Sequence, residues 1–395
     1  MGRSLVERDE VLMKVKLKFI TPFIVGGIKR VSNYIETLDY IPGNVIRAAF
    51  TRYILNNCSC FSHDEIVVVN GEKRKNWVSF KNKAECESCR LRNICINFQS
   101  IKFSFFYPEG TDIIPITTMR CKMKPEHRLI DNLTEITECP DCIKAGSSDT
   151  RVESVSGYIK NRMDYKVKKT LFTRTAIDKY TGTAMDGLLY SIEAVTGTDD
   201  KSNIIYEGQI DGISNEDVSC IEELRVGKYT SVGFGRCSIH SISENGQSQV
   251  ESREGIIEKM KSFSERYKNN NKLEDSWNYI AIKFVADAKL DFRDQDGNKA
   301  RFDRYISNDI LKNIWLNSLN ADRIIEQSYK IDKVYAEIFN FRGYDTSKPD
   351  DIREQPVHMI QKGSVIVFRT QKFFSDILDD FATLDGFGLD IENGF

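Results

Sequence analysis

The chain has 395 residues, of which 56 are Lys or Arg and 58 are Asp or Glu, giving a net charge of −2. Its length predicts two or three domains, and a composition of 41% hydrophobic and 29% charged residues excludes disordered and collagen-like chains. The balanced charge excludes a polycation attracted to phosphate everywhere, so a nucleic-acid site would have to be local.

Membrane and export signals are missing from the sequence pattern. No apolar run approaches the ~20 residues that cross a bilayer, and the start MGRSLVERDE lacks the apolar centre of a secretory signal. We therefore expect a cytoplasmic protein without a membrane partner. In that reducing compartment the ten cysteines are expected to be metal ligands before disulfides.

The first pattern in chain order is an alternating strand at 11–19, whose Lys14, Lys16 and Lys18 form a basic outer face. That face is either part of a nucleic-acid site or a solvated sheet edge. After a glycine turn, Asn44 is the expected N-cap of a helix reaching about residue 55. A strand, a glycine turn and a helix are the opening of a ferredoxin-like split βαβ unit.

A cysteine-rich insertion follows at about 58–142. Cys86-x2-Cys89-x5-Cys95 forms one thiolate group, which Cys58 or Cys60 completes. Cys139-x2-Cys142 forms a second group with Cys121, and His127 is nearby. Such C-x2-C turns place two thiolates on one tetrahedral zinc, so we expect one or two structural zinc sites, and the spacing leaves the number open. The predicted metal ligands are Cys58, Cys60, Cys86, Cys89, Cys95, Cys121, Cys139 and Cys142.

Residues 157–174 are predicted to form a basic hairpin with interleaved aromatic residues, which is either an RNA contact or a solvated hairpin. Strands are expected at 188–194 and 204–210. The loop 226–236, VGKYTSVGFGR, precedes a further strand at 237–242. This loop is either a tight turn between strands or an RNA contact, in which glycines let backbone N–H groups approach phosphate and Lys, Arg, Tyr and Phe supply charge and stacking faces.

The composition changes after His240, and we place a domain boundary near 245–275. The chain is thereby divided into an N-terminal domain at 1–245, a connecting helical segment at 246–274 and a C-terminal domain at 275–395. Both halves end in a Gly-Phe-rich segment, which suggests two copies of one α+β unit. The elements expected beyond residue 250 are a helix at 255–267, a strand at 277–286, a helix at 308–319, strands at 331–341 and 364–368, and a helix at 373–384.

Enzyme motifs are missing from the sequence. The loop 226–236 lacks the G-K-[ST] ending of a nucleotide-binding loop, and no GxSxG, HExxH or dinucleotide fingerprint occurs. Only four histidines are present, and none lies in the glycine loop. Hydrolase, metalloprotease and dehydrogenase functions therefore have no support.

Two elements carry a family resemblance. Residues 40–49, YIPGNVIRAA, resemble the "IPGSSLRGA" element of the RAMP superfamily of CRISPR-associated proteins, although Asn44 and Ala48 stand where that family usually has Ser and Gly. Residues 227–236, GKYTSVGFGR, resemble the glycine-rich loop of the same superfamily. The chain looks like a RAMP protein.

A more detailed resemblance is to the double-RAMP subunit of type III-D CRISPR effectors, the Csx-ten group, which is similar in architecture to the Cas-five subunit. Residues 116–122, 139–142, 175–191 and 362–365 and the closing Gly-Phe segments carry it. In relatives the closing segment continues with a basic residue and a strand, so the resemblance implies a shortened second loop here.

This resemblance implies an α+β fold of two ferredoxin-like, RRM-related modules with the cysteine-rich zinc-binding insertion. It implies a non-catalytic subunit that caps the 5′ tag end of a crRNA beside the large polymerase-type subunit and the backbone RAMP subunits, and that meets target RNA indirectly. The predicted RNA-binding residues are Lys29, Arg30, Arg47, Arg52, Lys160, Arg162, Lys168, Lys169, Arg174, Lys228, Tyr229, Ser231, Gly233, Phe234, Gly235 and Arg236.

Two alternatives remain at this stage. The first is a metal-independent endoribonuclease that processes precursor crRNA, in which Tyr, Lys or His would activate a 2′-hydroxyl. The second is a zinc-stabilised scaffold with protein partners alone. Cleavage of repeat RNA in EDTA distinguishes the first from an RNA-binding subunit, and elution free of RNA distinguishes the second.

Overall fold

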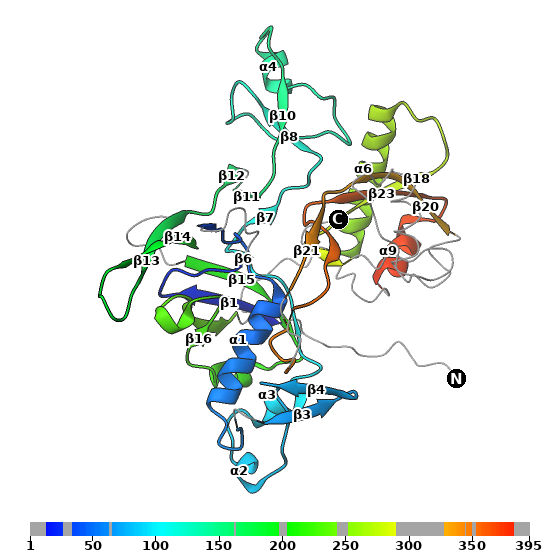
Figure 1. Ribbon diagram of the computed structural model, residues 1–395. Coiled ribbons are helices and arrows are strands. Elements are labelled where there is room, and N and C mark those ends of the chain that lie inside the picture. Colours follow the sequence, from blue (N-terminus) through cyan, green and yellow to red (C-terminus); the bar gives the residue numbers. More distant parts are fainter. Residues whose placement is uncertain are drawn as a thin grey trace, which may run out of the picture. The chain divides into compact units, whose positions relative to one another are not determined.

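The computed structural model describes residues 13–26, 34–62, 65–161, 163–196, 204–242, 252–289, 328–343, 345–349 and 353–382 (Figure 1). Several predicted features lie outside the described residues, namely Lys29, Arg30, Arg162, the helix at 308–319 and the closing Gly-Phe segments. The described chain is mixed α+β and forms two compact units. Unit 1 is drawn from Met1–Thr111, Lys166–Ser243 and Tyr344–Glu354, and unit 2 from Asp112–Tyr165, Glu244–Gly343 and Gln355–Phe395.

The central sheet of unit 1 has the strand order β16-β17-β1-β15-β5, and β6 also pairs with β15. β1 is an inner strand, so its interpretation as a sheet edge is wrong. The alternation of apolar side chains along β1 explains its inner position in the sheet, because Met13, Val15, Leu17 and Phe19 are all buried. The strands are β1 (Met13–Phe19), β5 (Lys102–Phe103), β6 (Tyr107–Pro108), β15 (Ile204–Asp211), β16 (Leu224–Arg225) and β17 (Arg236–Ser241).

Helix α1 (Gly43–Asn56) follows β1, and α5 (Asn215–Ser219) lies between β15 and β17. A ferredoxin-like unit has four antiparallel strands in the order 4-1-3-2. Here β17, β1 and β15 are the fourth, first and third strands, and β5 and β6 together take the place of the second. The helix begins at Gly43, so Pro42 rather than the predicted Asn44 occupies the N-cap position. Gly43 is required there, because a Cβ on it would lie 2.1 Å from the carbonyl oxygen of Phe103.

A second sheet of unit 1 contains a long hairpin of β13 (Lys169–Ile177) and β14 (Ala184–Val195), with β2 (Tyr34–Ile35) parallel to β14. The predicted basic hairpin at 157–174 is therefore wrong as a single element. Asn161, with a φ of 51°, folds β11 (Tyr158–Lys160) onto β12 (Met163–Tyr165) in unit 2, whereas β13 pairs with β14 in unit 1.

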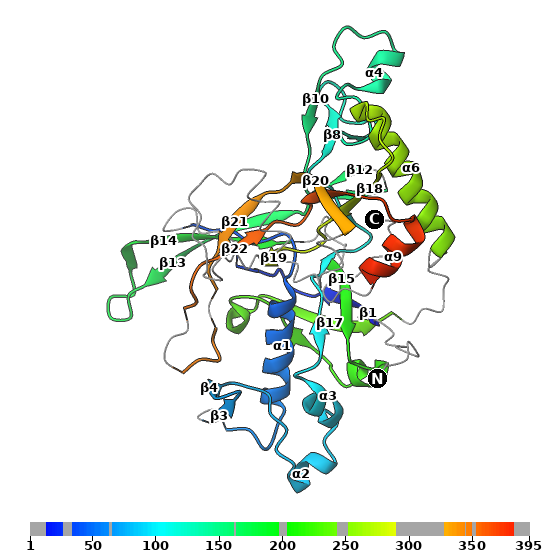
Figure 2. The same ribbon diagram turned by 90° about the vertical axis from the view of Figure 1, so that its right-hand side faces the viewer.

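The first part of the cysteine-rich insertion gathers at the C-terminal end of α1, as Figures 1 and 2 both show. It consists of a hairpin and two short helices. These are β3 (Ile66–Val69), β4 (Glu72–Lys75), α2 (Ala84–Glu87) and α3 (Arg92–Asn97). Arg74 on β4 donates to Asp345, so the segment 345–349 is fixed to this hairpin.

Unit 2 has a sheet of order β18-β23-β20, with α6 packed beside β18 and α9 following β23 (Figure 2). A second sheet has the order β19-β22-β21. The predicted strand 331–341 is two strands, β20 and β21, which belong to different sheets. The bounds are β18 (Asn278–Lys283), β19 (Ala288–Lys289), β20 (Tyr329–Tyr335), β21 (Ile338–Phe341), β22 (Val357–Ile360), β23 (Val365–Thr370), α6 (Arg253–Asn271) and α9 (Phe374–Ala382).

The second part of the insertion, at 112–155, belongs to unit 2 rather than to the unit that holds β1. It pairs β8 with β9 and β10, and α4 lies between β9 and β10 in the chain. These elements form an arm, which Figure 1 shows at its top. The bounds are β7 (Asp112–Ile113), β8 (Thr118–Cys121), β9 (Ile130–Asp131), α4 (Pro140–Lys144) and β10 (Val152–Ser154).

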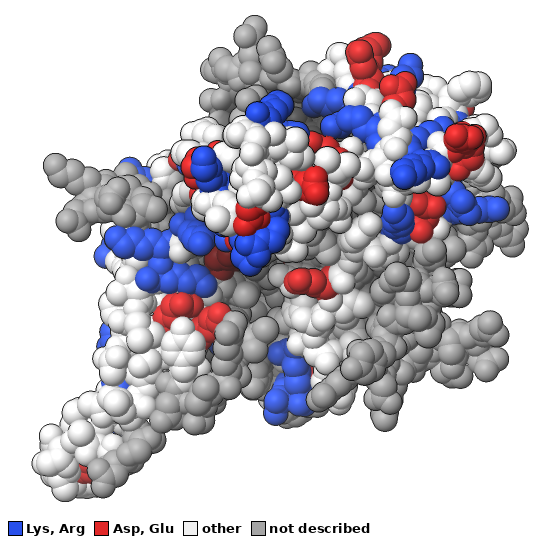
Figure 3. All heavy atoms as spheres, turned by 90° about the horizontal axis from the view of Figure 1, so that it is seen from above, with Lys and Arg blue, Asp and Glu red and all other residues white. Residues whose placement is uncertain are grey.

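Each unit has its own apolar core. In unit 1, α1 contributes Ile46, Ala49, Phe50 and Ile54 to the cluster under the central sheet. In unit 2, residues of β18, β20, β23 and α9 form a separate cluster. Within the described ranges no helix is both long and apolar enough to cross a membrane. Figure 3 shows cationic and anionic side chains interspersed on one face, so charge is mixed there.

Candidate functional site

The glycine loop is held rigidly against residues 22–24 of unit 1. Lys228 donates its backbone N–H to the carbonyl of Ile24 at 2.8 Å, and Gly235 donates to Pro22 at 2.8 Å. Gly227 and Gly235 have φ values of 92° and 74°. A Cβ would lie 2.2 Å from the Ile24 carbonyl oxygen at Gly227, and 2.0 Å from the Val226 carbonyl oxygen at Gly235. Only glycine fits both positions.

Cations from three elements surround this loop. Lys228 is exposed, and its side chain covers Gly26. Arg52, exposed on α1, donates to the Thr230 hydroxyl at 2.7 Å. Arg236 forms an ion pair with Glu223 at 2.7 Å, and that carboxylate raises the pKa of the guanidinium. Lys228 and Arg52 therefore present charge at the loop, while the charge of Arg236 is balanced by its neighbour.

The aromatic side chains of the loop differ in access. Phe234 is 5% exposed and packs edge-on against Phe172 of β13, with ring centroids 5.4 Å apart. It anchors the loop, so the expectation that it stacks on a base has no support in this geometry. Tyr229, in a left-handed conformation with a φ of 57°, is half-buried against the same cluster. Ser231 and Gly233 are exposed at the tip.

Hairpin β13–β14 extends this surface with Arg174 and Tyr190. The Arg174 guanidinium lies 5.7 Å from the centroid of the Phe234 ring, and Tyr190 is the cross-strand partner of Arg174. Both are on the strand face that carries Phe172, because alternate residues share a face. Sequence analysis missed Tyr190 as a site residue, since only the register of β13 against β14 places it beside a loop that lies 40 residues further along the chain.

Other predicted RNA-binding residues lie elsewhere. The Arg47 guanidinium donates to the Ile101 carbonyl at 3.2 Å and lies over Phe98, and burial lowers its pKa. The Lys169 ammonium donates to the Thr37 carbonyl at 2.7 Å. Lys160 lies over Tyr165 in unit 2, and Lys168 is exposed just before β13. The loop surface therefore brings together Arg52, Arg174 and Lys228 from the predicted set, with Arg236 beside them.

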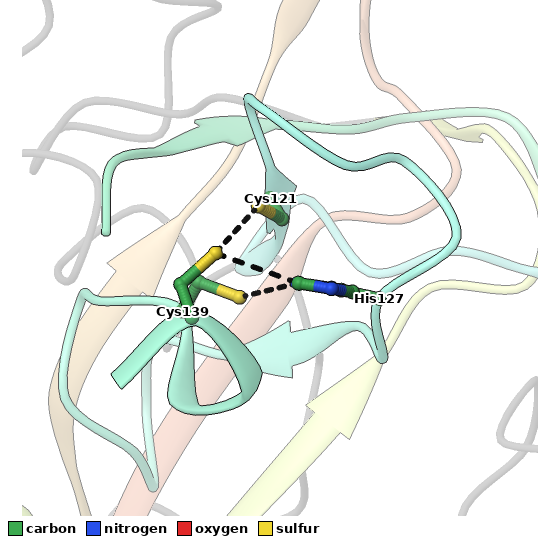
Figure 4. Close-up of side chains that lie close together, drawn as sticks. Cys121, His127 and Cys139 are labelled. Carbon is green, nitrogen blue, oxygen red and sulfur yellow. Dashed lines mark hydrogen bonds between the residues drawn. The ribbon is translucent and has the colours of Figure 1, made fainter. Parts of the chain in front are cut away.

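A second candidate site lies in the arm of unit 2. Cys121, His127, Cys139 and Cys142 bring their ligand atoms within 4.8 Å of one another, and Figure 4 shows the labelled side chains pointing toward one another. The Cys121 and Cys142 sulfurs are 3.6 Å apart. His127 Nδ1 lies 3.2 Å from the Cys139 sulfur and 3.5 Å from the Cys142 sulfur.

These separations fit one tetrahedral ion. Zinc–sulfur bonds of about 2.3 Å and zinc–nitrogen bonds of about 2.0 Å place sulfurs ~3.8 Å apart and nitrogen ~3.6 Å from sulfur. All three cysteines are buried. Four protein ligands complete the coordination and leave no open position, which is the arrangement of a structural rather than a catalytic site.

The local fold explains why these four side chains meet. Cys121 ends β8, and its sulfur accepts the backbone N–H of Lys124 at 3.3 Å. Cys139 caps α4, where Pro140 at the first helical position fixes the turn that carries Cys142. The sequence predicted these three cysteines as metal ligands, and the structure brings them together with His127 in a group that could hold a metal ion. The sequence analysis noted His127 only as lying near these cysteines. A single histidine belongs to no C-x2-C pair, so no local motif marks it as a ligand.

The five remaining predicted ligands are in unit 1. Cys58 and Cys60 follow α1, Cys86 lies in α2, Cys89 in the turn after it, and Cys95 in α3. Among the described residues, only the group of Cys121, His127, Cys139 and Cys142 has at least three ligand atoms within 4.8 Å of one another. The insertion thus contains two separate thiol groups, one in each compact unit.

Fold and sites together define a mixed α+β protein with a ferredoxin-like sheet, a rigid glycine loop flanked by cations, and a Cys/His cluster that can bind a metal ion. The sequence model of the RAMP superfamily matches residues 16–238, which is more than half of the 395 residues. The chain belongs to the RAMP superfamily.

Comparisons with solved structures find remote similarity. One similar chain is from a structure titled as the type III-B Cmr-beta bound to cognate target RNA and AMPPnP, with 14% identity, a TM-score of 0.43, and coverage of 93% of this chain and 87% of that chain. Another, titled as Cmr-beta bound to cognate target RNA, has 12% identity, a TM-score of 0.40, and coverage of 90% and 86%. No curated protein matches the sequence.

Proposed function

We propose that this protein is a non-catalytic RNA-binding subunit of a type III CRISPR effector, of the type III-D double-RAMP group. In that role it holds the 5′ tag end of a crRNA beside the large polymerase-type subunit and the backbone subunits. Membership of the RAMP superfamily supports this proposal, as do the resemblances of residues 40–49 and 227–236 to elements of that superfamily.

The observation that carries the proposal is the rigid glycine loop with Lys228 on it and Arg52 and Arg174 beside it. Single-stranded RNA is bound by cations that follow its backbone and by aromatic rings on which bases stack. Here Lys228, Arg52 and Arg174 neutralise phosphates, exposed backbone groups of 231–233 approach the sugar-phosphate chain, and Tyr190 or Tyr229 offers a stacking face. Phe234 supports the loop from below.

A second ferredoxin-like module completes the proposed architecture. In such a module, strand 3 lies between strands 1 and 2 and is followed by the second helix. The order β18-β23-β20, with α9 after β23, matches this arrangement. The Cys121 group belongs to the arm of this unit, and we assign it to structural zinc. Because a closed four-ligand site stabilises a fold without supplying a reactive water, it contributes rigidity rather than cleavage.

Binding of a 5′-tagged guide RNA tests the function. The variant with both Lys228→Ala and Arg174→Ala is expected to bind more weakly, because two phosphate contacts are lost. The slope of log binding constant against log salt should fall by about 0.7 per contact, or about 1.4 for the pair. Fluorescence anisotropy over a salt series measures both quantities.

Lys73→Ala is the matched control, since Lys73 is an exposed lysine on β4 of the same unit. It should bind with the wild-type affinity and slope. Equal affinity and slope in the double variant would exclude the loop surface as the RNA site. A loss of affinity without a change of slope would show that the two cations do not contact phosphates.

Incubation with precursor repeat RNA in EDTA separates the binding function from the endoribonuclease alternative. We expect intact RNA, because the histidine nearest the loop in sequence, His240, is bonded through its Nε2 to the Ser238 hydroxyl at 2.9 Å on an exposed face of β17. Discrete cleavage that a Lys228→Ala variant abolishes would instead make the loop an active site. Gel analysis of end-labelled RNA provides the readout.

A further inference from the structure

Five cysteines of unit 1 come together from three segments at the C-terminal end of α1. Cys58 and Cys60 follow that helix, Cys86 and Cys89 belong to α2 and the turn after it, and Cys95 lies in α3. None of these side chains has a part in the loop surface that we propose for RNA. All five are free thiols, so their convergence requires its own explanation.

A small cavity lies between these segments, with a volume of ≈ 20 Å³. Four of the five cysteines line it, namely Cys58, Cys86, Cys89 and Cys95, and the other lining residues are Ile54, Asn57, Phe80, Leu91 and Arg92. About 10–15 Å³ accommodates one water-sized guest. A space for one atom that four cysteine residues line suits a soft divalent cation, since thiolates are the ligands that such ions select.

The Cys60 and Cys86 sulfurs are 3.9 Å apart, whereas a disulfide requires about 2.05 Å, so this pair is not oxidised. Among the described residues no three of the five sulfurs lie within 4.8 Å of one another, so an ion would draw the ligand segments closer together as it binds. Cys60 contacts Cys86 but does not line the cavity.

The backbone around the cavity has little stability of its own. α2 has 4 residues and α3 has 6, which is too short for either helix to persist without tertiary support. A turn joins them, in which Cys89 donates to the Cys86 carbonyl at 3.4 Å and Arg92 donates to the Cys89 carbonyl at 3.0 Å. This turn presents Cys86 and Cys89 from one knuckle, and an ion bound there would cross-link it to α1.

We propose that Cys58, Cys86, Cys89 and Cys95 bind a divalent cation of the zinc class in unit 1, with Cys60 adjacent to this ligand set and outside it. The site is structural, because four thiolates fill a tetrahedral coordination sphere. It is independent of the Cys121 group, which belongs to the other compact unit. The chain therefore holds two ions, and removal of one leaves the other in place.

Metal analysis of the full chain tests this inference. We expect two equivalents of zinc in the wild type, one in Cys89→Ser or Cys95→Ser, and one in Cys139→Ser. The double variant Cys89→Ser, Cys139→Ser should hold none. Cys60→Ser and the control Cys220→Ser should both hold two, since Cys220 is a partly exposed cysteine at the end of α5 and outside both groups.

Cobalt substitution of the wild type gives a readout that does not depend on the folding of variants. Two filled sites give the thiolate-to-cobalt absorption of seven thiolates, four from the cysteines of unit 1 and three from the Cys121 group. If only the Cys121 group binds cobalt, the absorption corresponds to three thiolates. A single equivalent of metal with three-thiolate absorption would overturn the inference. Loss of metal in Cys60→Ser, with retention in Cys58→Ser, would overturn the ligand set.

Discussion

Gly233 and Gly235 lie two residues apart in the glycine loop and have different reasons to be glycine. Both have a positive φ, 102° and 74° respectively. A Cβ at Gly233 would meet nothing within 4 Å, whereas one at Gly235 would lie 2.0 Å from the Val226 carbonyl oxygen. Gly233 therefore requires only a left-handed backbone, and Gly235 requires in addition the absence of a side chain.

This difference predicts unequal costs of alanine. Gly233→Ala should lower the free energy of unfolding by roughly 1–2 kcal/mol, the cost of a left-handed backbone for an L-residue. Gly235→Ala should exceed that by roughly 1–3 kcal/mol, because the loop has to move away from Val226. The midpoint of thermal unfolding measures both. Equal midpoints would show that the loop is not fixed against Val226 as described.

For single residues, the sequence predicted which side chains belong to a candidate site better than it predicted what each of them does there. Cys121, Cys139 and Cys142 were predicted as ligands because C-x2-C is a local signal. Phe234 was predicted as a stacking residue, yet its ring lies in the cluster with Phe172, which is 62 residues away in the chain. Whether an aromatic side chain faces RNA or a core depends on such distant neighbours, and spacing alone does not give them.

Among the elements, the arm of β8, β9, β10 and α4 has the smallest core of its own. Its buried cluster consists of Cys121, Cys139 and Cys142, with Val152 packed against it. Two-residue and four-residue strands and a five-residue helix bury little apolar surface. If the proposed ion is bound, the arm therefore depends on the group of Cys121, His127, Cys139 and Cys142 more than the central sheets do.

Removal of the metal is expected to unfold the arm alone. In Cys139→Ser, which leaves the cysteines of unit 1 unchanged, the segment between β8 and β10 should become sensitive to protease while the cores of both units stay protected. Mass spectrometry of limited-proteolysis fragments identifies the cleavage sites. Cys220→Ser is the control, and its fragments should match the wild type. Equal protection of the arm with and without metal would contradict this dependence.

Element prediction succeeded where the pattern was local and periodic. The strand at 13–19 and the helix at 43–56 follow from alternation and from helical spacing of apolar residues. The predictions of one hairpin at 157–174 and of one strand at 331–341 were wrong, because in each segment a strand-like pattern continues through a turn. In both, the chain changes partner between two sheets, and strand partnership is decided by residues far along the sequence.

For the whole molecule, the mixed α+β class was predicted from the strand, glycine turn and helix at the start of the chain and from the family resemblance, and unit 1 has the ferredoxin-like strand order that this pattern predicts. The mixed charges on the face in Figure 3 accord with a net charge of −2. Division of the insertion between two units was not predictable, because no change of composition marks the passage from residue 111 to 112.

The interleaving of the two units has a consequence for biosynthesis. Residues 112–165 leave the ribosome about 200 residues before β23, which is the middle strand of the sheet β18-β23-β20. Leu133 of that segment packs with Val365 and Val367 of β23, so at about 5–20 residues per second the segment waits roughly 10–40 s for this contact. A polypeptide that ends before residue 344 lacks the last segment of unit 1 and the strands β22 and β23 of unit 2, so neither unit is complete until translation is nearly finished.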